Sequence, residues 1–420
     1  MHHKLGKPFQ SLWLASTSGA LADGLAATAL PLLMVTLTRD PLKISLLQVA
    51  SGLPWLVLGL PAGVLADRWD RRRVLWSTDL GRAAVALGLT GVVLAGATSV
   101  PVILVAALLY GAGTVLFRSA APSALPALVD APDLTRANSR LQIGTTTTGA
   151  LAGPSLGGVL FTLGAWLPTL TQTGALLLSV GALRGLPVGQ PHQRDTSEHT
   201  RGPMRAEIAQ GLRTVFRDPV LRGLATATSM LAASTGMLLA ILVLHVVETL
   251  DAPQSSYGLL FTLYATGSLA ASAVVAILHS TLGTRRCLLA SAALGAASLL
   301  IIAWAPTATI AAIGMVMLGA ATMIYNVLAV TLRQQHTPDQ ILGRVSSIFN
   351  VVGVGSVPVA ALAAGVLASH YGTPLTISSG AGLCVFAGLA IATLIPNLDT
   401  KTADEPKHGH VDQRESDDKP

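Results

Sequence analysis

Long runs without a charged side chain are the feature that most constrains how this sequence can fold. Four of them cover residues 44–66, 83–117, 141–183 and 287–332. A helix of about 20 apolar residues crosses the hydrocarbon core of a bilayer and satisfies its own backbone hydrogen bonds there. Only 11% of the 420 residues are charged, against roughly 25% in an average soluble domain. The sequence therefore predicts an all-α membrane protein.

The uncharged runs can be counted as twelve transmembrane helices. The three longest runs each divide into two spans, at residues 96–101, near Gly164 and near Pro306. Six further spans are predicted at residues 11–37, 44–66, 224–244, 252–278, 345–369 and 372–398. An even number of spans leaves both termini on the same side of the membrane.

The basic residues indicate which side that is. Of the 27 Lys and Arg residues, 25 fall on the side of the N-terminus, and only Arg39 and Lys43 fall on the other. Because membrane proteins keep Lys and Arg on the cytoplasmic side, we expect both termini to be cytoplasmic, in a bacterial cell membrane. The net charge of +6 comes from short clusters between apolar runs, which argues against binding of nucleic acid.

A polar segment near the centre divides the chain into two halves of six helices. Residues 1–186 are the predicted N-terminal half and residues 220–398 the C-terminal half, followed by a disordered cytoplasmic tail at 399–420. Residues 187–219 are predicted as a cytoplasmic linker, since the Pro, Gly and charge at its start cannot span a bilayer. Apolar residues at helical spacing later in the linker predict a short helix on the inner leaflet, with an extension of span seven as the alternative.

The two halves echo each other weakly, which indicates pseudo-symmetry of the kind found in transporters. Gly63 and Asp67 after span two correspond to Ala276 and Ser280 after span eight, 213 residues later. A pair of arginines follows in each half at the same spacing.

The turn between spans two and three reads Gly-Val-Leu-Ala-Asp-Arg-Trp-Asp-Arg-Arg-Arg over residues 63–73. The glycine allows two helices to approach closely, and an acid beside arginines can form a charge-assisted contact at a helix end. This turn resembles the loop signature of the major facilitator superfamily, a fold of twelve helices in two halves. The alternative is a basic cluster that only sets the orientation.

In that superfamily the signature joins the two halves on the cytoplasmic side when the cavity opens outward. The resemblance implies a conformational latch made of Gly63, Asp67, Arg68, Arg71, Arg72, Asp79 and Arg82. Within this set Asp79 and Arg82 are three residues apart at the start of span three, and we expect them to form a structural pair.

Span five carries small residues at helical spacing. Gly149, Gly153 and Gly157 recur every fourth residue and form one smooth stripe, while Pro154 favours a bend. With Gly158, these residues resemble the glycine and proline motif that marks proton-coupled exporters within the superfamily; plain helix packing is the alternative. The Gly-x-Ser-x-Gly spelling around Ser155 does not indicate a hydrolase, because it lies inside a predicted membrane helix.

The resemblance covers essentially the whole chain. Residues 122–138 and 333–347 are most similar to bacterial drug and siderophore exporters of the superfamily. The sequence departs from many drug-proton antiporters because residues 105–115 of span four contain no arginine, and Arg118 lies further towards the cytoplasmic end.

Asp23 is, on the sequence, the only acid well inside a span. A charged side chain at that depth costs roughly 2.5–3.5 kcal/mol on insertion scales, so Asp23 must be paired or protonated. We hypothesise that Asp23 binds and releases the coupling proton; a structural hydrogen bond to a neighbouring helix is the alternative. His245 and Glu248 at the outer end of span seven are interpreted as an outer gate or as solvated helix-end residues.

Polar and aromatic side chains within spans are the substrate-lining candidates. They are Gln48, Trp55, Gln142, Thr146, Gln172, Tyr264, Tyr325, Asn326 and Asn350. A mostly apolar cavity with few polar anchors favours amphiphilic or cationic organic molecules over sugars.

The sequence therefore predicts a secondary transporter that exports small amphiphilic molecules, such as antibiotics, in exchange for protons. An exporter of a specific metabolite or siderophore, or an importer of the same fold, is the alternative. No enzymatic nucleophile, metal cluster or cofactor site is evident, and no phosphate-binding loop for ATP is present, so the proton gradient is the expected energy source. One chain supplies both halves, so we expect a functional monomer.

Overall fold

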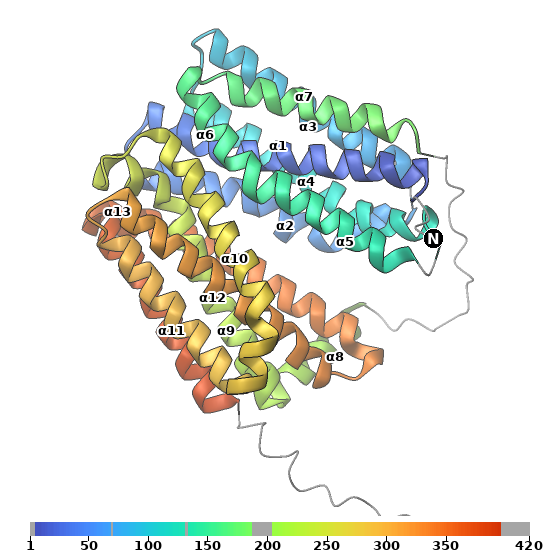
Figure 1. Ribbon diagram of the computed structural model, residues 1–420, viewed down its shortest axis with the longest axis vertical. Helices are drawn as coiled ribbons and strands as arrows, with labels where there is room; N and C mark the ends of the chain where they lie inside the picture. Colours follow the sequence, from blue (N-terminus) through green and yellow to red (C-terminus); the bar gives the residue numbers. More distant parts are fainter. Residues whose placement is uncertain (1–4, 69, 131–132, 187–203, 396–420) are drawn as a thin grey trace, which may run out of the picture.

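The computed structural model describes residues 5–68, 70–130, 133–186 and 204–395, and these residues are helical apart from short connections (Figure 1). The helices of the first half are α1 (Lys7–Leu37), α2 (Pro41–Arg68), α3 (Arg71–Leu94), α4 (Val100–Ala124), the short η1 (Leu125–Ala127), α5 (Leu134–Thr145), the π-helix η3 (Thr146–Ala152), α6 (Gly153–Leu163) and α7 (Leu167–Leu183). Those of the second half are α8 (Met204–Arg217), α9 (Pro219–Leu244), the π-helix η4 (His245–Thr249), α10 (Gln254–Leu282), α11 (Thr284–Ala303), α12 (Ala308–Gln335) and α13 (Asp339–Leu394).

The helices match the twelve predicted spans. Nine helices in the described part of the chain are long and apolar enough to cross a membrane. One of them, α13, is 56 residues long and non-helical at Gly372 (φ 79°), so it folds back there and crosses twice. The remaining two spans are α7 and the continuous run α5, η3 and α6. The chain is therefore a multi-pass membrane protein of the predicted fold class.

Span three begins earlier than the sequence indicated. The sequence placed Asp79 and Arg82 at the start of span three, just before the uncharged run from residue 83. Instead α3 begins at Arg71, where the Asp70 side chain accepts a hydrogen bond from the Arg72 amide at 2.9 Å. This capped start draws Asp79 and Arg82 into the interior of the helix. The prediction that Asp23 is the only acid well inside a span is therefore wrong, because Asp79 is also inside one.

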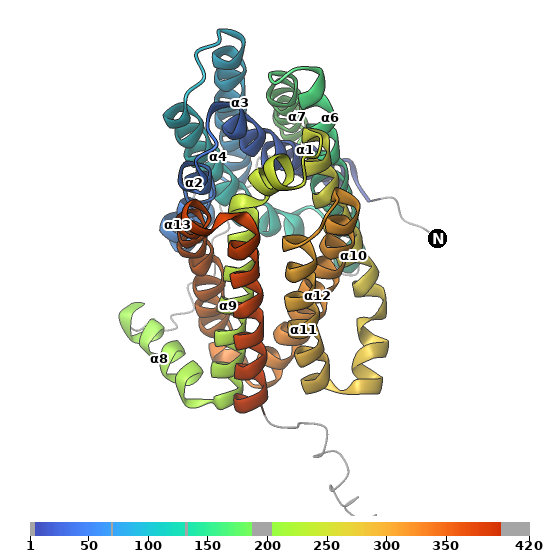
Figure 2. The same cartoon turned by 90° about the vertical axis from the view of Figure 1, so that its left-hand side faces the viewer.

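The short helix predicted within the linker is present as α8. It is separate from α9, because the Asp218 side chain accepts hydrogen bonds from the amides of Val220 and Leu221 and begins a new helix. Figure 2 shows α8 beside the bundle at an angle to α9. The helix α8 is therefore not a continuation of α9, and its predicted place on the inner leaflet stays a prediction. Residues 187–203 of the linker and the predicted tail lie outside the described residues.

The two halves touch at the end of the molecule away from α8 and diverge towards it (Figure 1). A Cβ added to Gly52 of α2 would lie 3.0 Å from Pro358 of α13, so these helices are in close contact. Gly258 of α10 lies against the carbonyl of Pro154 in α6. We call this contact region the seam; Ser155 and Thr262 also hydrogen bond across it at 2.6 Å.

The glycine stripe of span five packs on α1. Gly149 lies against the backbone of Ala20, and Gly153 lies so close to Gly24 that an added Cβ would be 2.7 Å from its Cα. Because Pro154 has no amide hydrogen, the helix widens into η3 directly before it, which is where a bend was predicted. Gly149 and Gly153 therefore pack closely on α1, as the helix-packing alternative describes.

Gly153→Ala should lower the free energy of unfolding by about 1–3 kcal/mol, because the added methyl meets backbone atoms that have no room to move. Gly174→Ala is the matched control, since no atom lies within 4 Å of a Cβ added there on α7. Thermal unfolding of the purified protein in detergent compares the two. Equal midpoints for both variants would show that the α1 contact is looser than described.

Candidate functional site

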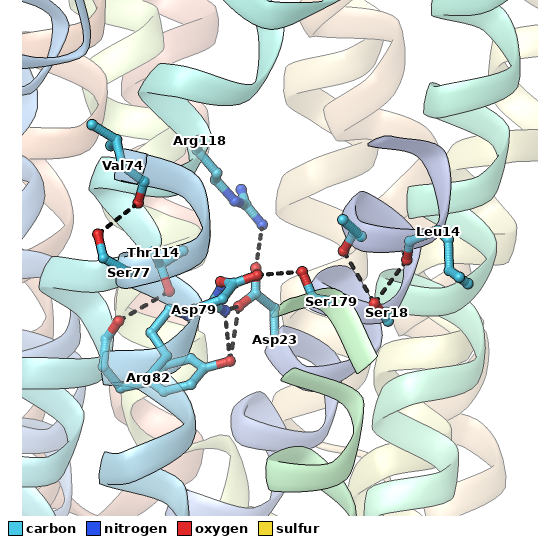
Figure 3. Close-up of polar contacts among 12 residues, drawn as sticks. Leu14, Ser18, Asp23, Val74, Ser77, Asp79, Arg82, Thr114, Arg118 and Ser179 are labelled. Atoms are coloured by element: carbon cyan, nitrogen blue, oxygen red, sulfur yellow. Dashed lines mark hydrogen bonds and ion pairs between the residues drawn. The ribbon is translucent and has the colours of Figure 1, made fainter. Parts of the chain in front are cut away.

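A buried cluster of charges connects α1 and α3 in the first half (Figure 3). The Arg82 guanidinium is 2% exposed and forms ion pairs with the carboxylates of both Asp23 and Asp79. The distance from Arg82 Nη1 to Asp79 Oδ1 is 2.8 Å, which confirms the pair predicted between these two residues. Asp79 is fully buried, so its charge is compensated by Arg82 and not by water.

Side chains from two further helices complete this cluster. Tyr110 of α4 donates a hydrogen bond to Asp23 at 3.0 Å and accepts one from Arg82 at 2.7 Å. Ser179 of α7 donates to Asp79, and the Arg82 guanidinium also lies 4.5 Å from the centre of the Tyr110 ring. Asp79 and its hydrogen-bond partners therefore hold α3 against α7, while Asp23 holds α1 against α3 and α4.

Asp23 differs from Asp79 in its access to open space. Its side chain is 21% exposed and lines a cavity of about 520 Å³ between the halves. Arg118, which is 58% exposed, reaches the second oxygen of Asp23 at 3.3 Å. An acid with one oxygen on a buried arginine and one on an exposed arginine at the cavity can exchange a proton with that cavity, whereas Asp79 is 0% exposed and has no such access.

Sequence reasoning missed the role of Arg82 as the partner of Asp23. It looked for an intramembrane arginine in span four, where many antiporters carry one, and placed Arg82 at the start of span three. The available signal was the three-residue spacing of Asp79 and Arg82, which puts them on one face of a helix. Arg118 also reaches Asp23 although it lies nearer the end of α4.

Five of the nine predicted lining residues face cavities at the seam. Gln48 of α2 lines three adjoining cavities, and Trp55 lines two of them. Tyr325 and Asn326 of α12 and Asn350 of α13 line a cavity of about 500 Å³ on the side of the second half. Residues of both halves thus enclose the same space, which is the arrangement expected of a substrate site.

The other four predicted lining residues do not line these cavities. Gln142 is exposed and donates a hydrogen bond to Thr146 one turn along the same helix. Gln172 is 3% exposed within the first half. Tyr264 contributes its carbonyl to the close packing of α10 on Gly319 of α12. Their polar character was not sufficient to identify the helix face that is turned towards the cavity.

The predicted latch can be described only in part. Gly63, Asp67 and Arg68 belong to the last part of α2 and Arg71 to the first turn of α3, and their side chains lie outside the described set. The side chain of Arg72 donates a hydrogen bond to the carbonyl of Arg184 at 2.8 Å, within the same half. The latch stays a prediction, as does the exporter role of the Gly149, Gly153, Pro154, Gly157 and Gly158 motif.

His245 and Glu248 lie at the end away from α8. His245 is fully buried and hydrogen bonds to Thr373 and to the carbonyl of Ile302, both at 2.9 Å, so it is not a solvated helix-end residue. Glu248 lies 3.7 Å from Arg39 of the other half. Both of these side chains are about half exposed, so this bridge adds little stability by itself.

Arg82→Gln should destabilise the protein by about 3–5 kcal/mol, because it leaves Asp79 buried without its counter-charge. Arg118→Gln removes a partner of the same Asp23 carboxylate from an exposed position and should cost only about 0–1 kcal/mol. Thermal unfolding in detergent measures both variants. The assignment of Arg82 as the central cation is wrong if Arg118→Gln is the more destabilised.

Curated relatives are exporters. The chain is 27% identical over 399 residues to the enterobactin exporter of Citrobacter koseri, with 93% of this chain and 92% of that protein covered. It is also 27% identical over 405 residues to the enterobactin exporter of Escherichia coli O81, with 92% of each chain covered. Both relatives match the chain over nearly its whole length.

Solved structures with the same fold are transporters. A mutant form of the nucleoside transporter NupG superposes with a TM-score of 0.77 at 13% identity, covering 92% of this chain and all of that one. A bacterial homologue of the iron transporter ferroportin, in an inward-facing state, superposes with a TM-score of 0.75 at 15% identity, covering 93% of this chain and 99% of that one. At these identities the likeness shows the fold alone.

The family match extends over residues 5–417, which is nearly the whole chain. It includes both halves, the charge cluster and the seam. The protein is a membrane transporter and not an enzyme, and it belongs to the transmembrane secretion effector family of the major facilitator superfamily.

Proposed function

We propose that the protein exports a specific small metabolite of the siderophore class by alternating access, driven by exchange for protons. The observation that carries the proposal is a cavity between the halves that is closed at the seam and carries a partly exposed acid, Asp23, on its wall. The similarity to enterobactin exporters over more than nine-tenths of the chain supports export and this class of cargo.

The described conformation is the one that loads cargo from the cytoplasm. The halves meet at the end bearing Arg39 and Lys43, which the distribution of basic residues assigns to the outside. The diverging end carries α8 and the arginines of the turn between α2 and α3, and we assign it to the cytoplasm. Both termini are then cytoplasmic, and the chain lies in the bacterial cell membrane.

Asp23 couples transport to the proton gradient in this proposal. In the described conformation Arg82 and Arg118 each bind one of its two oxygens. A proton that reaches Asp23 from the outside removes the charge of its carboxylate and frees the exposed Arg118, whereas Arg82 stays paired with Asp79. The proton is released when the cavity faces the cytoplasm again and the two arginines bind the carboxylate.

In the proposed cycle the latch around the turn between α2 and α3 holds the cytoplasmic end of the cavity closed. When the seam opens, the turn between α2 and α3 approaches the second half, and its acid and arginines can then bond across the interface. This change also separates Gly258 from the Pro154 carbonyl. Because one chain supplies both halves of the cavity, a monomer is sufficient for this cycle.

Asp23→Asn should abolish transport driven by a pH gradient while leaving passive exchange of cargo, because the amide can keep hydrogen bonds but cannot carry the proton. We expect a loss of about tenfold or more in gradient-driven uptake into inside-out proteoliposomes, with enterobactin as the probe. Asp40→Asn is the control, since Asp40 lies outside the cavity and an amide oxygen can still cap α2. Full gradient-driven transport by Asp23→Asn would contradict the role of this residue.

The cargo class is tested in a bacterial host that lacks its own exporters of siderophores and drugs. Expression of the chain should restore release of enterobactin into the medium, measured by chromatography, and should leave the tolerated concentrations of a panel of antibiotics and dyes within about twofold of the empty vector. Raised drug tolerance without enterobactin release would instead support the antibiotic efflux that the sequence first suggested.

A further inference from the structure

One cavity-lining arginine of the second half lacks an ion-pair partner among the side chains that the structure describes. Arg333 lies in the last turn of α12 and lines the cavity of about 500 Å³. Its Nε atom is buried without a hydrogen-bond partner, and no ion pair of Arg333 occurs among the side chains that the structure describes. A cation in this position must be neutralised by water or by a molecule in the cavity.

The aromatic ring of Phe349 holds this guanidinium in place. The Arg333 guanidinium carbon lies 5.0 Å from the centre of the Phe349 ring, and both residues line the same cavity. A guanidinium that lies over a ring can still donate N–H hydrogen bonds from its terminal nitrogens, and two parallel donors match the two oxygens of a planar oxyanion. The arrangement favours Arg333 as a binding group over a charge that only sets membrane orientation.

The charges around the connected cavities do not cancel. The charged lining residues described for these cavities are Asp23, Arg118 and Arg333. Asp23 is already paired with Arg118 and with the buried Arg82 behind it. The enclosed space is therefore electropositive, and a cationic cargo would meet two arginines and no free acid.

Three amide side chains near Arg333 are free to orient a bound molecule. Gln48, Asn326 and Asn350 line the same cavity, and none has a side-chain hydrogen bond within the described part of the protein. Tyr325 is different, because its hydroxyl already donates to the carbonyl of Leu224 at 3.0 Å. The site thus offers one cation and three amides against an apolar wall that includes Trp55 and Phe349.

We propose that the cargo is an organic anion whose oxyanion group is bound by Arg333, with Gln48, Asn326 and Asn350 fixing its orientation. The inference deepens the proposed function by naming the charge of the cargo. It replaces the preference for cationic molecules that the sequence indicated, because the apolar composition of the spans did not reveal that Arg333 lines the cavity.

The charge of the cavity can be measured without knowing the cargo. Asn350→Cys is introduced into a background of Cys287→Ala and Cys384→Ala, and its rates of modification by negatively and positively charged methanethiosulfonates are compared. Each rate is divided by the rate for a free thiol in solution. We expect the anionic reagent to be favoured by about fivefold or more, as for unit charges about 8 Å apart in a water-like medium.

Variants of Arg333 show whether this residue causes the preference for the anionic reagent at position 350. The anionic preference should disappear in Arg333→Gln and in Arg333→Met, which keeps an unbranched chain against Phe349, and it should persist in Arg333→Lys. A cysteine at Leu37, which is 39% exposed at the far end of α1, should show the same reagent ratio in all backgrounds. An absent preference at position 350, or one unchanged by both uncharged variants, would overturn the proposal.

Binding of enterobactin as the probe separates this inference from the proposed function. Arg333→Gln should weaken binding by about tenfold, and Arg333→Lys by less, because lysine keeps the charge and loses the planar pair of donors. If the parent protein does not bind enterobactin but keeps the preference for the anionic reagent at position 350, the siderophore cargo is contradicted and the preference of the cavity for anions is supported. If the Arg333→Gln variant binds enterobactin as well as the parent protein does, the role of Arg333 is contradicted, whereas the proposed export of a siderophore is not.

Discussion

The structure of the first half depends on one buried cation. Arg82 lies between Asp23 of α1 and Asp79 of its own helix, and Tyr110 of α4 and Ser179 of α7 bond to the same carboxylates. Two acids and one arginine in a low-dielectric interior are stable only when each charge is paired, since any one of them left alone would carry a large desolvation penalty. Four helices are thereby fixed relative to one another at the depth where Asp23 meets the cavity.

In the proposed cycle the two acids have different tasks. Asp79 is fully buried and belongs to the permanent structure, whereas Asp23 is 21% exposed and has the exposed Arg118 as a second partner. Removal of the Asp23 charge by a proton would leave Arg82 neutralised by Asp79, so the helices stay in place while the cavity wall changes its charge. A transporter needs this separation, because the coupling group must change state without unfolding its surroundings.

Close backbone packing sets the other constraint. Gly24, Gly153 and Gly258 allow α1, α6 and α10 to approach more closely than side chains would permit, and the widened turn η3 is a direct result of the missing amide hydrogen of Pro154. The same stretch forms one face on α1 within its half and another on α10 across the seam. A motif that looks like simple packing in the sequence is thus located where the two halves must separate and meet again.

The sequence by itself determined the class of fold, the number of crossings and the division into halves, because the need to satisfy backbone groups in lipid leaves long uncharged helices as the only solution. It also determined the glycine stripe and the Asp79 and Arg82 pair, since both follow from helical periodicity. Only the tertiary structure decided that Arg82 and Arg118 converge on Asp23. It also decided that Gln48 and Asn350 face one cavity while Gln172 is buried, and that Arg333 lines that cavity without an ion pair among the described side chains. These facts depend on how each helix is rotated about its axis, and in apolar helices with weak amphipathic patterns that rotation is fixed by packing against neighbours distant in the chain.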